Sequence, residues 1–92
     1  AMGIRERKVE SYLTERIREK NGDTWKLTGT AGLPDRLCLL KKQGFFLVEV
    51  KSADGVTSSA QHRLREKMEK MGGDSYVVYG REGVDQLIDS LC

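Results

Sequence analysis

The chain is poor in the residues that several common active sites require. Its 92 residues include one histidine, two cysteines and one proline. The single histidine, His62, excludes mechanisms that need paired histidines, and a solvent-facing helix position is its expected role. There is no CxxC pair, glycine-rich phosphate loop or Ser-His-Asp set. Because Cys38 and Cys92 lack metal-ligand spacing, we expect free thiols in a reducing compartment.

Long apolar runs are also lacking. No run approaches the roughly 20 residues that span a bilayer, and the start lacks the basic and apolar regions of a secretory signal. A composition of 38% hydrophobic and 33% charged residues is typical of a soluble globular protein. We therefore expect no membrane partner and a cytoplasmic location. The net charge of +2 is by itself weak support for a nucleic-acid partner.

Hydrophobic spacing predicts one domain over residues 1–92, with the element order αβββαβα. The expected helices cover residues 4–20, about 58–71 and 84–91, and the expected strands cover residues 25–27, 36–40, 45–51 and 76–79. The middle two strands form an antiparallel hairpin, and a helical crossover brings the last strand back parallel, which gives a mixed sheet. We expect the second helix to bury a stripe formed by Gln61, Leu64, Met68 and Met71. We expect Trp25, the methionines of the second helix or the stripe of the last helix to be available to a partner.

The most informative segments are residues 32–35, Gly-Leu-Pro-Asp, and residues 48–51, Val-Glu-Val-Lys. Alternation along a strand places Glu49 and Lys51 on one face and Val50 on the other. Asp35 begins the neighbouring strand and approaches Glu49, and two close carboxylates favour a shared proton or a bound cation such as Mg²⁺. The simpler alternatives are turn chemistry for Asp35 and a solvated ion pair for Glu49 and Lys51.

Two further polar residues have two open interpretations each. Glu10 lies in line with Leu13 and Ile17 on the first helix, so it either reaches the site or pairs with a lysine or arginine one turn away. Gln61 is either a satisfied polar group in the first turn of its helix or a ligand to phosphate, lysine or water.

Together, these residues resemble the PD-(D/E)XK nuclease signature. Lys26 before the loop, the Gly-Leu-Pro-Asp turn, the Val-Glu-Val-Lys strand, and Ser59 and Gln61 opening the next helix resemble the VRR-Nuc branch, in the stand-alone form carried by phages and prophages. The resemblance covers nearly the whole chain. It implies an α/β, restriction-endonuclease-like αβββαβ core with a mixed sheet, followed here by a short C-terminal helix.

The resemblance also implies a function, a Mg²⁺- or Mn²⁺-dependent DNA endonuclease that cuts branched DNA such as four-way (Holliday) junctions as a homodimer. No small-molecule cofactor is expected, and the cell is a bacterial or phage-infected host. Lys51 would orient or deprotonate the attacking water, and Gln61 would be a supporting polar residue. The products would carry 5′-phosphate and 3′-hydroxyl ends. The implied metal ligands are Glu10, Asp35, Glu49 and the Val50 carbonyl, with Glu6 and Glu15 as alternatives to Glu10. The expected nucleic-acid contacts are Lys26 and Arg63.

Two alternatives remain open. The first is a DNA-binding module without catalysis that uses the same face, although clustered carboxylates weaken binding to a polyanion. The second is a structural or partner-binding domain, which is favoured only if the protein binds neither metal nor DNA.

Overall fold

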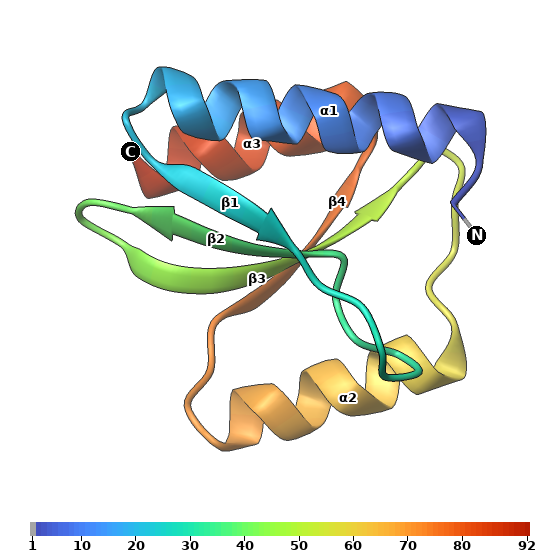
Figure 1. Ribbon diagram of the computed structural model, residues 1–92. Helices are drawn as coiled ribbons and strands as arrows, with labels where there is room; N and C mark the ends of the chain where they lie inside the picture. Colours follow the sequence, from blue (N-terminus) through green and yellow to red (C-terminus); the bar gives the residue numbers. More distant parts are fainter. Residues whose placement is uncertain (1) are drawn as a thin grey trace.

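The computed structural model describes residues 2–92 and consists of one sheet between helices (Figure 1). The strands lie in the order β1-β2-β3-β4; β1, β2 and β3 are antiparallel neighbours, and β4 is parallel to β3. In chain order, the elements are α1 (Ile4–Glu19), β1 (Asp23–Lys26), β2 (Arg36–Leu40), β3 (Gly44–Lys51), α2 (Ser59–Lys70), β4 (Ser75–Tyr79) and α3 (Gly80–Leu91). The expected order and the mixed sheet are confirmed.

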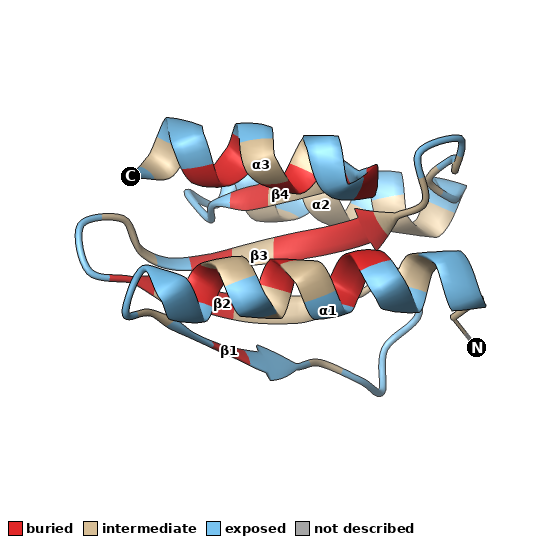
Figure 2. Ribbon diagram, turned by 90° about the horizontal axis from the view of Figure 1, so that it is seen from above, coloured by how far each residue is buried: buried red, intermediate tan, exposed pale blue. Residues whose placement is uncertain are grey.

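The hydrophobic core lies on one side of the sheet. α1 and α3 cover this side, whereas α2 lies on the other (Figure 1). Figure 2 shows buried positions concentrated in β3 and on the inner sides of α1 and α3. The core side chains come from both helices and from three strands: Val9, Leu13, Ile17, Cys38, Leu40, Phe46, Val48, Val50, Val78, Val84, Leu87 and Ile88.

Helix α1 forms because apolar side chains recur once per turn along it. Leu13 and Ile17 are fully buried one turn apart. The helix ends where Asn21 adopts a left-handed backbone (φ 62°) and the amide of Gly22 donates back to the carbonyl of Ile17 at 3.0 Å. This turn leads the chain into β1, which begins two residues earlier than expected because Asp23 and Thr24 also pair with β2.

Two expectations about the helices are wrong. Helix α2 has no buried residue, and Met71 after it is 78% exposed, because α2 lies on the opposite side of the sheet from the core. The stripe of α3 is not available to a partner, since Val84, Leu87 and Ile88 are buried in the core. Among residues 2–92, no helix combines the length and apolar character needed to cross a membrane.

Candidate active site

The site is built where β2 begins and β3 ends. Asp35 immediately precedes β2, and its Oδ2 accepts a hydrogen bond of 2.7 Å from the backbone amide of Val50. The carbonyl of Asp35 also accepts from the amide of Leu27 at 2.9 Å. Asp35 is therefore held by its side chain to β3 and by its backbone to the end of β1.

Glu49 projects from β3 toward α2, while Val48 and Val50 are buried in the core, as alternation predicts. Its side chain is nearly inaccessible, with the residue 4% exposed. One oxygen, Oε2, accepts a 2.6 Å hydrogen bond from Nε2 of Gln61, whereas Oε1 is buried without any hydrogen-bond partner. Burial first, and then the neighbouring carboxylate of Asp35, raise the pKa of Glu49 to about 8.

Lys51 shares this face and lies close to Glu49. Its Nζ is 3.9 Å from Oε2 of Glu49, which is an ion-pair distance and too long for a hydrogen bond. The ammonium group is therefore available to a further acceptor. A pocket of about 390 Å³ opens in front of these groups and is lined by Met2, Glu6, Lys26, Asp35, Glu49, Lys51 and Gln61.

Of the two roles left open by the sequence, the structure shows Gln61 as a satisfied polar group in the first turn of its helix, and its amide also contacts the acid Glu49. Ser58 caps α2, because its Oγ accepts from the amide of Gln61 at 3.1 Å while its own amide donates to Oε1 of Gln61 at 2.8 Å. The other end of the same side-chain amide donates to Glu49. The cap thus fixes the side chain that contacts the buried acid.

The loop before Asp35 is packed against the start of α2. Gly32 has φ +82°, and a Cβ atom there would lie 2.5 Å from the carbonyl oxygen of Ala60. Only glycine permits both this backbone conformation and this approach. The contact fixes the spacing between the segment that carries Asp35 and the helix that carries Gln61.

The structure does not bring Glu10 to the other acids. Both of its carboxylate oxygens lie 3.1 Å from Nζ of Lys26, and Oε2 also accepts from Arg36 at 3.2 Å. Glu6, one turn earlier on α1, lines the pocket instead, and its charge contributes to the raised pKa of Glu49. Residues four apart share a helix face, so periodicity alone does not separate Glu6 from Glu10.

The remaining predicted residues divide between this pocket and other surfaces. Lys26 lines the pocket, as stated above. Arg63 is exposed on α2 and borders a neighbouring pocket with Lys67, outside the group around Glu49. His62 is on the surface of α2, where its Nε2 lies 2.7 Å from Glu66, as expected for a solvent-facing residue.

Comparisons with known proteins support the resemblance. No family model matches the sequence, and no curated protein matches it. Among solved structures, a chain named "VRR_NUC domain" superposes with a TM-score of 0.85 and 30% sequence identity, over 95% of this chain and 97% of the other. The chain belongs to the VRR_NUC domain family. Membership makes it a nuclease-type, DNA-processing domain.

The site of this VRR_NUC domain fits a divalent cation. Among residues 2–92, there is no cluster of three or more histidine, cysteine, aspartate or glutamate side chains suited to hold a metal. Mg²⁺ does not require such a cluster, since it typically takes one or two carboxylates, waters and substrate phosphate oxygens. The unpartnered, buried Oε1 of Glu49 beside Asp35 is the kind of group that a cation would satisfy.

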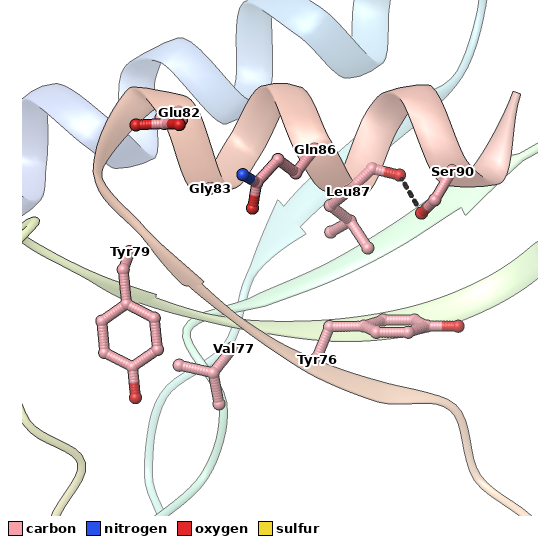
Figure 3. Close-up of a pocket in the computed structure, with 8 residues that line it drawn as sticks. All are labelled: Tyr76, Val77, Tyr79, Glu82, Gly83, Gln86, Leu87 and Ser90. Atoms are coloured by element: carbon pink, nitrogen blue, oxygen red, sulfur yellow. Dashed lines mark hydrogen bonds between the residues drawn. The ribbon is translucent and has the colours of Figure 1, made fainter.

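A larger pocket in the VRR_NUC domain, of about 490 Å³, lies between β4 and α3 (Figure 3). Its polar lining includes Glu82, Gln86 and Ser90, and the hydroxyl of Ser90 donates back to the carbonyl of Leu87. None of the side chains that line it is basic. It lacks both the paired acids and the lysine that phosphate chemistry would use, so we place the candidate site at Asp35, Glu49 and Lys51.

Proposed function

We propose that this VRR_NUC domain is a Mg²⁺- or Mn²⁺-dependent endodeoxyribonuclease that hydrolyses phosphodiester bonds. The observation that carries the proposal is the buried Glu49 carboxylate, which has one unpartnered oxygen, an adjacent Asp35 and an ammonium group 3.9 Å away. A pair of acids that repel one another is costly in a purely structural site. A cation and a phosphate in the pocket would balance these charges.

Asp35, Glu49 and the backbone carbonyl of Val50 are the groups we assign to the cation. When bound, the cation would polarise the scissile phosphate and stabilise the charge that develops on its oxygens. As an ammonium group, Lys51 would orient the attacking water through Nζ and counter the same charge, whereas deprotonating the water would require the neutral amine. Gln61 holds Glu49 through the 2.6 Å hydrogen bond, so it acts as a positioning residue.

Lys26 and Arg63 are the proposed contacts to nucleic acid. Lys26 lines the pocket with the acids, and Arg63 lies on α2, where it lines the neighbouring pocket. A DNA-binding module without catalysis is the second candidate, because the same basic groups would contact phosphates. The clustered acids disfavour it, since they oppose binding to a polyanion unless a cation intervenes.

We further propose that the substrate is branched DNA, above all four-way junctions, and that the protein acts as a homodimer in the cytoplasm of a bacterial or phage-infected cell. Trp25 is 45% exposed, and Met71 is also exposed, so apolar surface remains for a partner. A small domain gains stability from association, and a twofold axis is the commonest arrangement. Two sites related by such an axis suit paired cuts.

The test is cleavage of end-labelled four-way, flap and plain duplex DNA of matched sequence, with Mg²⁺, Mn²⁺, Ca²⁺ or EDTA. We expect cleavage with Mg²⁺ and Mn²⁺, none with EDTA, and the highest rate on the four-way substrate. Light scattering at micromolar concentration should give a dimer mass. Binding without cleavage under every metal condition would favour the non-catalytic module, and a monomer that cuts all three substrates equally would remove only the junction and dimer proposals.

A further inference from the structure

Lys26, which lines the pocket, belongs to a cluster of three charges whose other two members do not line it. Glu10, Lys26 and Arg36 come from α1, β1 and β2, respectively. Nζ of Lys26 is 3.1 Å from each oxygen of Glu10, and Nη1 of Arg36 donates to Oε2 of Glu10 at 3.2 Å. The lysine ammonium is therefore held symmetrically by one carboxylate.

The three side chains differ in their exposure to solvent. The side chains of Glu10 and Arg36 are 10% and 13% exposed, whereas that of Lys26 is 49% exposed. Nε of Arg36 is also anchored, because it donates to Oγ1 of the buried Thr24 at 3.1 Å. The two enclosed charges neutralise each other, so the cluster carries a net positive charge, and the exposed ammonium of Lys26 presents it.

We propose that Glu10, with Arg36 as its counter-charge, is a positioning residue that holds the ammonium of Lys26 at the pocket wall to bind a DNA phosphate beside the scissile one. The inference rests on the proposed function and assigns Glu10 a role other than metal ligand. A free lysine side chain has many rotamers. Because Glu10 holds the ammonium group of Lys26 before DNA binds, less side-chain entropy is lost when the phosphate binds.

The position of the cluster supports this role. Lys26 lies at the end of β1 and Lys51 at the end of β3, with β2 and Asp35 between them. Both lysines line the pocket that contains the acids, and the strands that carry them are about 10 Å apart by ordinary strand spacing. A DNA backbone that enters this pocket would meet both lysines.

If Glu10 positions Lys26, removing its carboxylate should change the affinity for DNA in the direction opposite to that expected from simple electrostatics. Removing a carboxylate from a DNA-binding protein normally strengthens binding to the polyanion. Glu10→Gln should instead weaken it, because Lys26 loses its anchor. Glu15 is on the same helix and exposed, so Glu15→Gln is the matched control and should bind DNA as well as or better than the wild type.

The experiment measures the affinity of the full chain for labelled four-way DNA over a range of salt concentrations, with Ca²⁺ in place of Mg²⁺. We expect Lys26→Met and Glu10→Gln each to weaken binding by about three- to tenfold and to reduce the salt slope by about one contact. The double variant should bind no worse than Lys26→Met alone. Glu10→Asp keeps the charge but shortens the reach, so it should weaken binding as well.

Several results would overturn the inference. One is unchanged affinity in Lys26→Met; another is tighter binding in Glu10→Gln, matching Glu15→Gln. Loss of Mn²⁺ binding by calorimetry in Glu10→Gln, with normal DNA affinity, would make Glu10 a metal ligand instead. If circular dichroism shows that Glu10→Gln does not fold, Glu10→Asp and Lys26→Met decide the outcome.

Failure of this inference is distinguishable from failure of the proposed function. A wild-type protein that binds DNA but never cleaves it would remove the nuclease proposal while leaving the binding comparison intact. A wild type that cleaves DNA while Lys26→Met binds normally would remove only the role of Glu10. A wild type without any DNA affinity would reject both.

Discussion

Replacing Glu49 with glutamine should stabilise the metal-free protein at alkaline pH. Burial and the neighbouring Asp35 raise the pKa of Glu49 from 4.5 to about 8 in the folded state. A carboxyl group with a raised folded pKa contributes stability that is present below the unfolded pKa and is lost as the pH rises through about 8. The amide of glutamine stays neutral and its oxygen can accept from Gln61, so it preserves the hydrogen bond that Glu49 makes.

The size of the effect follows from the pKa shift. Each unit corresponds to about 1.4 kcal/mol, so the shift sets an upper bound of about 5 kcal/mol for ionising Glu49 in the fold. Water that enters the pocket in front of this residue lowers the cost. We therefore expect Glu49→Gln to raise the free energy of unfolding by about 1–3 kcal/mol at pH 8 and to change it little at pH 5.

Urea unfolding in EDTA, followed by circular dichroism at pH 5 and pH 8, measures this difference. Glu15→Gln is the control, because that acid is exposed. Added Mn²⁺ should stabilise the wild type at pH 8 and have little effect on Glu49→Gln. A variant that is equally or less stable than the wild type at pH 8 would refute the claim that ionising the buried Glu49 destabilises the metal-free protein.

Three further predictions concern the rest of the site. Lys51→Ala should lose cleavage far more than Mn²⁺ binding, measured by calorimetry, and Lys51→Arg should rescue cleavage poorly because a planar fork does not replace a compact ammonium; loss of metal binding would make the lysine a structural support. Gly32→Ala should lower stability by about 2–3 kcal/mol and slow cleavage, whereas Gly29→Ala, with open space at its Cβ, should cost only about 1 kcal/mol in urea unfolding. Ser58→Ala should cost about 1 kcal/mol and reduce kcat, because the cap also positions Gln61; an unchanged kcat would separate the two roles.

The sequence was informative wherever spacing alone decides the outcome. Period-two alternation placed Glu49 and Lys51 on the face opposite Val50, and the expected αβββαβα order is the order observed. The short hairpin turn implied that Asp35 would lie beside β3, and its side chain bonds the amide of Val50. These features depend on local geometry, which a sequence records directly.

Other features of the site and of helix burial depend on tertiary packing, which the sequence pattern does not record. The apolar residues of α2 predicted a buried stripe, but an amphipathic pattern does not tell whether another layer covers it, and α2 has none buried. Glu6 and Glu10 share a helix face, and they differ because Lys26 and Arg36 form ion pairs with Glu10. The raised pKa of Glu49 likewise arises from burial and neighbours that tertiary packing supplies.

The central claim is that Asp35 and Glu49 form the catalytic centre of a phosphodiester hydrolase, and single-turnover cleavage of four-way DNA by Asp35→Asn tests it most directly. The matched control is Asp54→Asn, because Asp54 is an exposed acid that accepts a hydrogen bond from the Ser52 hydroxyl and pairs loosely with Arg5. With Mg²⁺, Asp54→Asn should cleave like the wild type, while Asp35→Asn should fall by at least about a hundredfold and remain folded. Full activity in folded Asp35→Asn would contradict the account.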